Sequence, residues 1–113
     1  MAYDYSLIGA LAYPSAAACR DALATARELL EHEETDFAEV VSAYWSTWFR
    51  AEGAMLHVSV VVSGPGDWWF ALEGLIEELA DDATAGFVDA RHESAPGLVT
   101  RYGAGGDEDE LSD

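Results

Sequence analysis

The sequence contains no lysine, and its five basic residues are all arginine, against 22 aspartates and glutamates, so that the formal net charge is −17. A protein that reads nucleic acid directly needs a basic surface, and this deficit argues against that class of function. Long apolar runs are also missing. Runs such as Val60–Val62 fall far short of the roughly 20 residues that a membrane-spanning helix needs. The sequence therefore predicts neither a direct nucleic-acid contact nor a membrane partner.

Cysteine is almost absent as well. Cys19 is the one cysteine of the chain, so an intramolecular disulfide is excluded. Its apolar neighbours recur at helical spacing, which favours a small buried side chain over a reactive thiol. The first residues carry no basic segment followed by a long apolar stretch, so no signal peptide is indicated and a cytoplasmic protein is expected.

Hydrophobic residues, by contrast, make up half of the 113 residues, and 12 % are aromatic. That content is enough for one domain with a core, and it argues against a disordered chain. We expect a single domain over residues 1–102. Residues 103–113 contain five of the 22 acidic residues and little to bury, which predicts an acidic disordered tail.

The N-terminal part predicts a strand followed by a helix. Tyr3–Tyr13 is rich in Tyr, Leu and Ile, and Pro14 ends it. Ser15 is a suitable N-cap, because its hydroxyl can accept a hydrogen bond from a first-turn amide. A helix is expected from there to about Glu33. Its apolar positions recur at three- and four-residue steps: Cys19, Leu23, Ala26 and Leu30.

The middle of the chain is rich in β-branched and aromatic residues, which favour strands. We predict a strand over Phe37–Arg50, a turn at Glu52-Gly53 and a second strand over Met55–Ser63, which together form a hairpin. In the second strand the alternation directs one set of side chains to the same face. That set is Leu56, Val58, Val60 and Val62.

A second helix is expected over Asp67–Ala83, with Asp67 as N-cap and an apolar stripe of Trp69, Leu72, Ile76 and Leu79. Strands at Phe87–Glu93 and Leu98–Tyr102 follow. This order predicts an α+β two-layer sandwich with a ferredoxin-like (split βαβ) antiparallel sheet. Two helices should cover one face of that sheet, and the last strand should be an extra C-terminal edge strand.

Motifs that specify a reaction are not found. The histidines, His32, His57 and His92, have no metal-ligand spacing, and no serine stands in a G-x-S-x-G context. The loop around Gly64 and Asp67 has the position of a phosphate loop but lacks the glycine and lysine pattern, so a helix cap explains it better. We therefore expect no enzyme, no cofactor and no metal site.

Two groups of residues are candidates for binding. In the predicted strand Phe37–Arg50, Tyr44 and Trp48 share one face, and Trp45 and Phe49 share the other. Both faces of that strand would carry large rings, so one set should lie on an exposed sheet face, and exposed aromatic patches mark interfaces. Trp45 and Trp48 are therefore candidate contact residues.

The second group is acidic. Glu73, Glu77 and Asp81 are four residues apart in the predicted second helix and form one stripe, with Glu78 and Asp82 beside it. No lysine or arginine occurs between Trp68 and Phe87. The stripe is either a solvated face of an acid-rich chain or a surface for a basic protein, whose association it would accelerate.

A small acidic domain without a catalytic motif resembles immunity proteins and other inhibitors that occlude basic, nucleic-acid-active enzymes. The resemblance is one of class, and no residue role is carried over from it. It implies an inhibitor whose carboxylates and aromatic rings bind a basic toxin or nuclease-like protein. The alternative is a dimeric ferredoxin-like module that binds a small ligand on an open aromatic sheet face, with or without catalysis. A homodimer would then form through the sheet.

Overall fold

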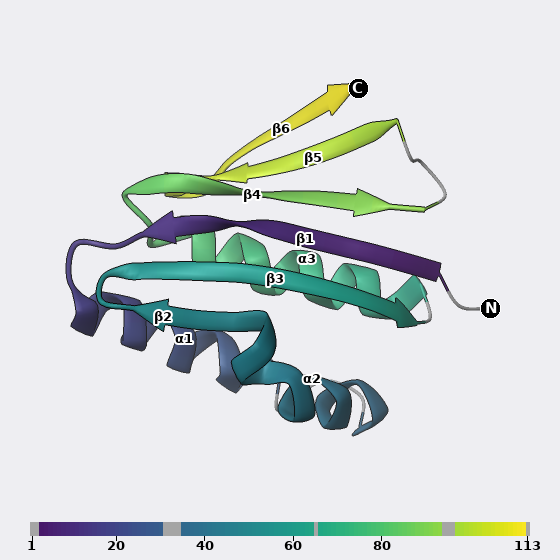
Figure 1. The fold of residues 1–113 in the computed structure, drawn as a ribbon, viewed down its shortest axis with the longest axis horizontal. Coiled ribbons are helices and arrows are strands. Elements are labelled where there is room, and N and C mark those ends of the chain that lie inside the picture. Colours follow the sequence, from purple (N-terminus) through teal and green to yellow (C-terminus); the bar gives the residue numbers. More distant parts are fainter. Residues whose placement is uncertain (1–2, 31–34, 65, 94–96, 113) are drawn as a thin grey trace.

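The computed structural model describes residues 3–30, 35–64, 66–93 and 97–112 (Figure 1). The elements follow in the order β1 (Tyr3–Ala12), α1 (Ala16–Leu30), α2 (Thr35–Trp48), β2 (Phe49–Glu52), β3 (Met55–Gly64), α3 (Gly66–Asp81), β4 (Ala85–His92), β5 (Leu98–Gly103), the 3-10 turn η1 (Ala104–Gly106) and β6 (Asp107–Ser112). Within these residues the chain forms a compact α+β globule.

Five strands form an open antiparallel sheet in the order β2-β3-β1-β4-β5, and β6 pairs with β5 beyond it. Since β3 runs antiparallel to both β1 and β2, the strands β1 and β2 are parallel to each other with β3 between them. By the same reasoning β3 and β4 are parallel, with β1 between them. Parallel strands require a crossover connection, and the crossovers here are α1 with α2 for the first pair and α3 for the second.

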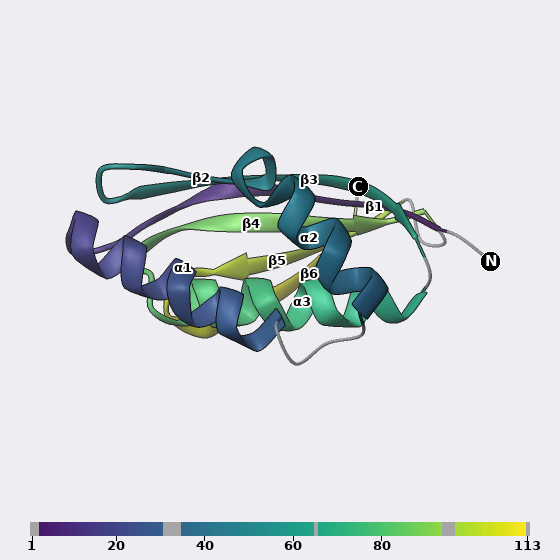
Figure 2. The same ribbon diagram turned by 90° about the horizontal axis from the view of Figure 1, so that it is seen from below.

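The helices of the described chain lie on one side of the sheet, as the edge-on view in Figure 2 shows. In Figure 1 the sheet is seen from its other side, with α3 behind β1 and β3. The α+β class with helices on one face is confirmed. The described residues contain three helices, however, where two were predicted.

The core lies between the two layers and follows the predicted periodicities. Leu56, Val58 and Val60 of β3 are buried, as the alternation predicted. On α3 the buried positions Leu72, Ile76 and Leu79 recur at three- and four-residue steps, which directs one side of this helix inward. The opposite side of α3 must therefore face away from the core.

The strand predicted over Phe37–Arg50 is wrong, since α2 occupies Thr35–Trp48 and β2 begins only at Phe49. The physical reason is the spacing of the apolar residues. Val41 and Trp48 are seven residues apart and both are buried, at 2 % and 4 % exposed, which is a helical period. Burying that stripe outweighs the strand preference of the individual residues.

The hairpin itself is confirmed, although its first strand is short. Phe49 pairs with Val58 and Glu52 with Met55. Gly53 in the connecting turn has a φ of 62°, in the left-handed region that glycine adopts without strain. The Glu52-Gly53 turn was therefore correctly predicted.

The N-cap of α1 is confirmed: the Ala18 amide donates a hydrogen bond to Ser15 Oγ at 3.1 Å. The predicted helix end at Glu33 and the side chain of Asp67 lie outside the described residues. In the segment predicted as a disordered tail, the structure has η1 and then β6, whose backbone pairs with β5 from Gly103↔Asp107 to Leu98↔Ser112.

None of the helices in the described part of the chain is long and apolar enough to cross a membrane.

Candidate functional site

The predicted acidic residues lie on α3 and just after its end. Glu73, Glu77 and Asp81 lie at four-residue steps on this helix, with Glu78 beside them, and Asp82 follows the last residue of the helix. Glu77, Asp81 and Asp82 are exposed, whereas Glu73 and Glu78 are half-buried. These five residues are called the acidic surface of α3 below.

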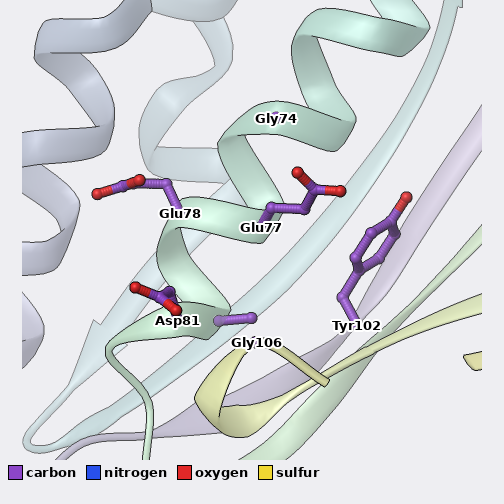
Figure 3. Close-up of a pocket in the computed structure, with 7 residues that line it drawn as sticks. Gly74, Glu77, Glu78, Asp81, Tyr102 and Gly106 are labelled. Atoms are coloured by element: carbon purple, nitrogen blue, oxygen red, sulfur yellow. The ribbon is translucent and has the colours of Figure 1, made fainter. Parts of the chain in front are cut away.

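A cavity of about 410 Å³ opens beside this surface, between the C-terminal half of α3 and the segment that leaves β5. It is lined by Gly74, Glu77, Glu78, Ala80, Asp81, Tyr102 and Gly106. Figure 3 shows the Glu77 side chain on the side of Tyr102, while Glu78 and Asp81 point away from that ring. The volume is within the range of about 300–1,000 Å³ that ligand pockets occupy.

Tyr102 forms the far wall of the cavity and was missed by the sequence analysis as a site residue. It is opposite Val88 in the register of β4 and β5, which directs its ring toward the helices, and it is 1 % exposed. Its hydroxyl donates a hydrogen bond to Glu73 Oε2. This bond holds the Glu73 carboxylate against the sheet, so Glu73 is a positioned side chain while Glu77 and Asp81 extend into solvent.

Gly106 closes the lower end of the cavity. Its φ is 87°, and a Cβ atom there would lie 3.1 Å from Asp81 Oδ1. The backbone of η1 therefore approaches the end of α3 closely. Asp107, the first residue of the acid-rich strand β6, follows directly, so further negative charge enters the sequence beside the cavity.

Cations are scarce around the acidic surface. The sequence from residue 68 to residue 87 contains no lysine or arginine. An ion pair lies on the open face of the sheet instead, where Arg101 Nε and Nη2 donate to the two carboxylate oxygens of Asp89 at 2.8 and 3.0 Å. The like charges on α3 are consequently not neutralised by their own sequence neighbours, and they give this part of the molecule a negative potential.

Trp45 and Trp48, the predicted aromatic contact residues, lie on α2, and neither lines the acidic cavity. Trp48 is 4 % exposed and stacks on Tyr44 with ring centroids 5.6 Å apart, so it is part of the core. Trp45 is half-buried against Phe49, and the Arg27 guanidinium lies 5.5 Å from its ring centroid. The expectation that these rings occupy a sheet face is wrong, because the segment is a helix.

A second, more apolar hollow of about 370 Å³ lies where α2, β3 and the start of α3 meet. Its lining is Val40, Tyr44, Trp48, Val61, Val62, Ser63 and Trp68. What remains exposed of the α2 rings therefore faces this hollow, on the side where β3 extends beyond its pairing with β2.

Two buried groups near the inner side of α3 have shifted pKa values. The Tyr13 hydroxyl donates to the Leu79 carbonyl oxygen at 2.5 Å. Burial raises the pKa of Tyr13 well above its ordinary value, and Cys19 and Asp82 add to the shift. Burial likewise raises the pKa of the Cys19 thiol, against a smaller lowering by Arg20. Cys19 thus stays a protonated thiol at neutral pH, which keeps it unreactive.

Metal-binding geometry is not found in the described part of the chain, where no three His, Cys, Asp or Glu residues gather closely enough to hold an ion. His57 lies 3.5 Å from Glu52 on the exposed hairpin. His92 packs edge-on against Trp69, with centroids 5.2 Å apart, and contacts Tyr5. These two histidines are on different elements and have different neighbours.

No protein-family model matches this sequence, and no curated protein and no solved structure matches it either. Function is therefore inferred from the surfaces of the molecule.

Proposed function

We propose that this protein binds a basic protein through the acidic surface of α3 and inhibits it by occlusion, in the manner of an immunity protein. The observation that carries this proposal is the gathering of five carboxylates around one cavity, in a stretch of sequence without a lysine or arginine. The partner is a toxin or nuclease-like enzyme whose own active surface is basic because it binds phosphates. The protein has no catalytic role of its own in this proposal.

Electrostatics supports an inhibitor of this kind in two ways. A surface of one sign accelerates the encounter with a partner of the opposite sign and disfavours acidic competitors. The cavity then offers a place for a lysine or arginine side chain of the partner, flanked by Glu77 and walled by Tyr102. Because the Tyr102 hydroxyl already holds Glu73, less side-chain freedom is lost on binding than for a fully mobile carboxylate.

The proposal extends to the fold and to the compartment. The interleaved parallel pairs β1/β2 and β3/β4, each joined through the helix layer, support a ferredoxin-like arrangement with α2 as an additional helix and β5 and β6 as additional edge strands. We propose a cytoplasmic place of action, where an inhibitor would neutralise its enzyme before that enzyme reaches nucleic acid.

Charge reversal on α3 tests the proposal. The variant Glu77→Lys with Asp81→Lys changes two exposed residues and leaves the Tyr102–Glu73 hydrogen bond in place. The matched control is Asp21→Lys with Glu28→Lys, two exposed residues of α1 that give the same change in net charge. A partner is first isolated with the wild-type protein, and its enzymatic activity and its binding kinetics are then measured with each variant.

We expect the isolated partner to be a basic enzyme that the wild-type protein inhibits. The α3 variant should lower its association rate and affinity at least about tenfold, and the α1 control should change both far less. Equal losses in the two variants would show that only net charge matters, and undiminished binding by the α3 variant would place the contact elsewhere. Either result would refute the proposed site.

The alternative hypothesis, a small-ligand module with an open aromatic sheet face, has lost the observation on which it rested. Of the rings that it invoked, Tyr44, Trp45 and Trp48 lie on α2. It stays a prediction without a site.

A further inference from the structure

The open face of the sheet carries a continuous apolar strip across its three central strands. Ile8 of β1 is 52 % exposed, Val61 of β3 is 69 % exposed and Phe87 of β4 is 42 % exposed. In the register, Ser6 is opposite Val61 and Ala10 is opposite Phe87, so Val61 and Phe87 are the diagonal neighbours of Ile8 on either side. Diagonal pairs on one sheet face are close enough for large side chains to touch.

This strip lies on the side of the sheet away from the helices. The buried positions of β1, namely Tyr5, Leu7 and Leu11, alternate with Ile8 and Ala10. Figure 1 looks onto this face, and no described segment passes in front of β1, β3 and β4. Exposed apolar patches that extend over several strands mark contact surfaces in most globular proteins.

The same face differs from the rest of the molecule in its charge. On β1 to β5 the open face carries Asp4, Glu52 and Asp89 on the acidic side. On the basic side it carries Arg50, Arg91 and Arg101, which are three of the five arginines of the chain. Three acids and three arginines cancel, with His57 neutral, although the whole chain has a charge of −17.

Charge balance of this kind selects the occupant. A strongly basic partner would be attracted to the acidic surface of α3 and not to a neutral face, and a strongly acidic partner would be repelled by the chain as a whole. A second copy of this chain is repelled wherever two helix layers meet. The open sheet face is the surface on which two copies can approach with opposite charges available to each.

The size of the face is sufficient for such a contact. Strands about 4.8 Å apart with a rise of about 3.4 Å per residue give a five-stranded face of roughly 600 Å². Stable interfaces bury about 800 Å² per partner, and weaker reversible ones bury less. A reversible dimer is therefore the expected assembly.

We propose that two copies of this chain associate through their open sheet faces, with Ile8, Val61 and Phe87 at the centre of the contact. The acidic surface of α3 lies in the other layer and stays accessible in this dimer. The inference does not depend on the proposed inhibitor function.

Sedimentation velocity of the full chain, from about 1 µM to about 500 µM, tests the association. The variants are Ile8→Glu and Val61→Glu, each of which places one new charge on the strip. The matched control is Phe70→Glu, because Phe70 is 71 % exposed and lies on α3 in the opposite layer. Circular dichroism and thermal unfolding of every variant establish that each one is folded.

We expect the wild-type protein to shift from monomer to dimer within this range. Ile8→Glu and Val61→Glu should each raise the dissociation constant of the dimer at least about tenfold, and Phe70→Glu should leave it unchanged. A wild-type protein that is monomeric throughout overturns the proposal, as does a dimer that only Phe70→Glu disrupts. Loss in Val61→Glu without loss in Ile8→Glu also overturns it, since Val61 additionally borders the hollow at α2.

Discussion

The acidic surface of α3 and the open face of the sheet are two sides of one small chain with opposite electrostatic character. The first gathers five carboxylates in a stretch of sequence without a lysine or arginine, and the second carries as many arginines as acidic residues on β1 to β5. A net charge of −17 therefore describes neither surface. Arguments from net charge about a basic partner apply to the helix layer, whereas contacts between copies depend on the face that the average conceals.

The largest effect is expected from a substitution that removes the common support of both surfaces. Trp48 is 4 % exposed in the core between the two layers, so Trp48→Ala should lower the free energy of unfolding by about 3–5 kcal/mol. Chemical denaturation measures the loss. Trp45→Ala is the control and should cost less, because Trp45 is only half-buried. Equal costs would mean that α2 contributes little to the core.

Salt should affect the two surfaces in opposite directions. Raising NaCl from about 0.05 M to about 0.5 M shortens the Debye length from more than 10 Å to less than 5 Å. Association of a basic partner with α3 should slow about tenfold. Dimerisation through the neutral face should instead tighten several-fold, because screening weakens the repulsion between two chains of charge −17. Stopped-flow binding and sedimentation at both salt concentrations measure the two effects, and a common sign would contradict the distinction between the surfaces.

The inner side of α3 provides a third reference, since it is the same helix without its acidic residues. Tyr13→Phe removes the hydrogen bond to the Leu79 carbonyl oxygen and should cost about 1 kcal/mol of unfolding free energy. The pKa of Tyr13 is raised in the folded protein, so the unfolded chain loses that proton first as the pH rises.

The stability contributed by the neutral Tyr13 hydroxyl is therefore complete below its ordinary pKa of 10.0 and is lost as the pH rises above that value. Denaturation midpoints between pH 7 and pH 11 should fall less steeply in Tyr13→Phe than in the wild-type protein. Parallel pH profiles of the two proteins would show instead that this hydroxyl is ionised as easily in the folded state as in the unfolded state.

The smallest effect is expected from single charge reversals. Glu77→Lys converts two like-charge contacts on α3, with Glu73 and Asp81, into attractive ones and should raise the stability by about 0.5 kcal/mol. Asp89→Lys on the sheet face breaks the ion pair with Arg101 and should lower it by up to about 1 kcal/mol, since the pair is partly exposed to solvent. Thermal unfolding at low salt compares the two. Changes of the same sign would remove the contrast between the faces.

Two neighbouring apolar segments show what could be predicted from the sequence. In Met55–Ser63 a true two-residue alternation gave both the strand and its buried face, with Leu56, Val58 and Val60 inward. In Phe37–Arg50 the same residue types suggested a strand, but the spacing of Val41 and Trp48 is helical. Composition was given more weight than period there, and that error also placed the tryptophans on a sheet face. Period is decided by burial, whereas composition is only a preference.

The cavity could not be predicted for a different reason. Glu77, Glu78 and Asp81 were identified from their spacing on one helix, which is local information. Tyr102 and Gly106 come from β5 and η1, and only the packing of these elements against α3 brings them to the carboxylates. The hydrogen bond from Tyr102 to Glu73 spans 29 residues. Contacts of that range depend on the assembled fold, and no local spacing reveals them.

The incomplete pairing of β3 has a consequence for the purity of the folded state. β2 pairs only with Met55–Val58, and the outer edge of residues 59–64 has no strand partner in the described part of the chain. An edge of this kind is a template for fibril growth by strand addition. The large negative charge keeps copies apart at neutral pH. Near the sequence pI of about 4.1 that repulsion vanishes, so the acidity that we assign to partner binding also serves as protection against amyloid-like aggregation.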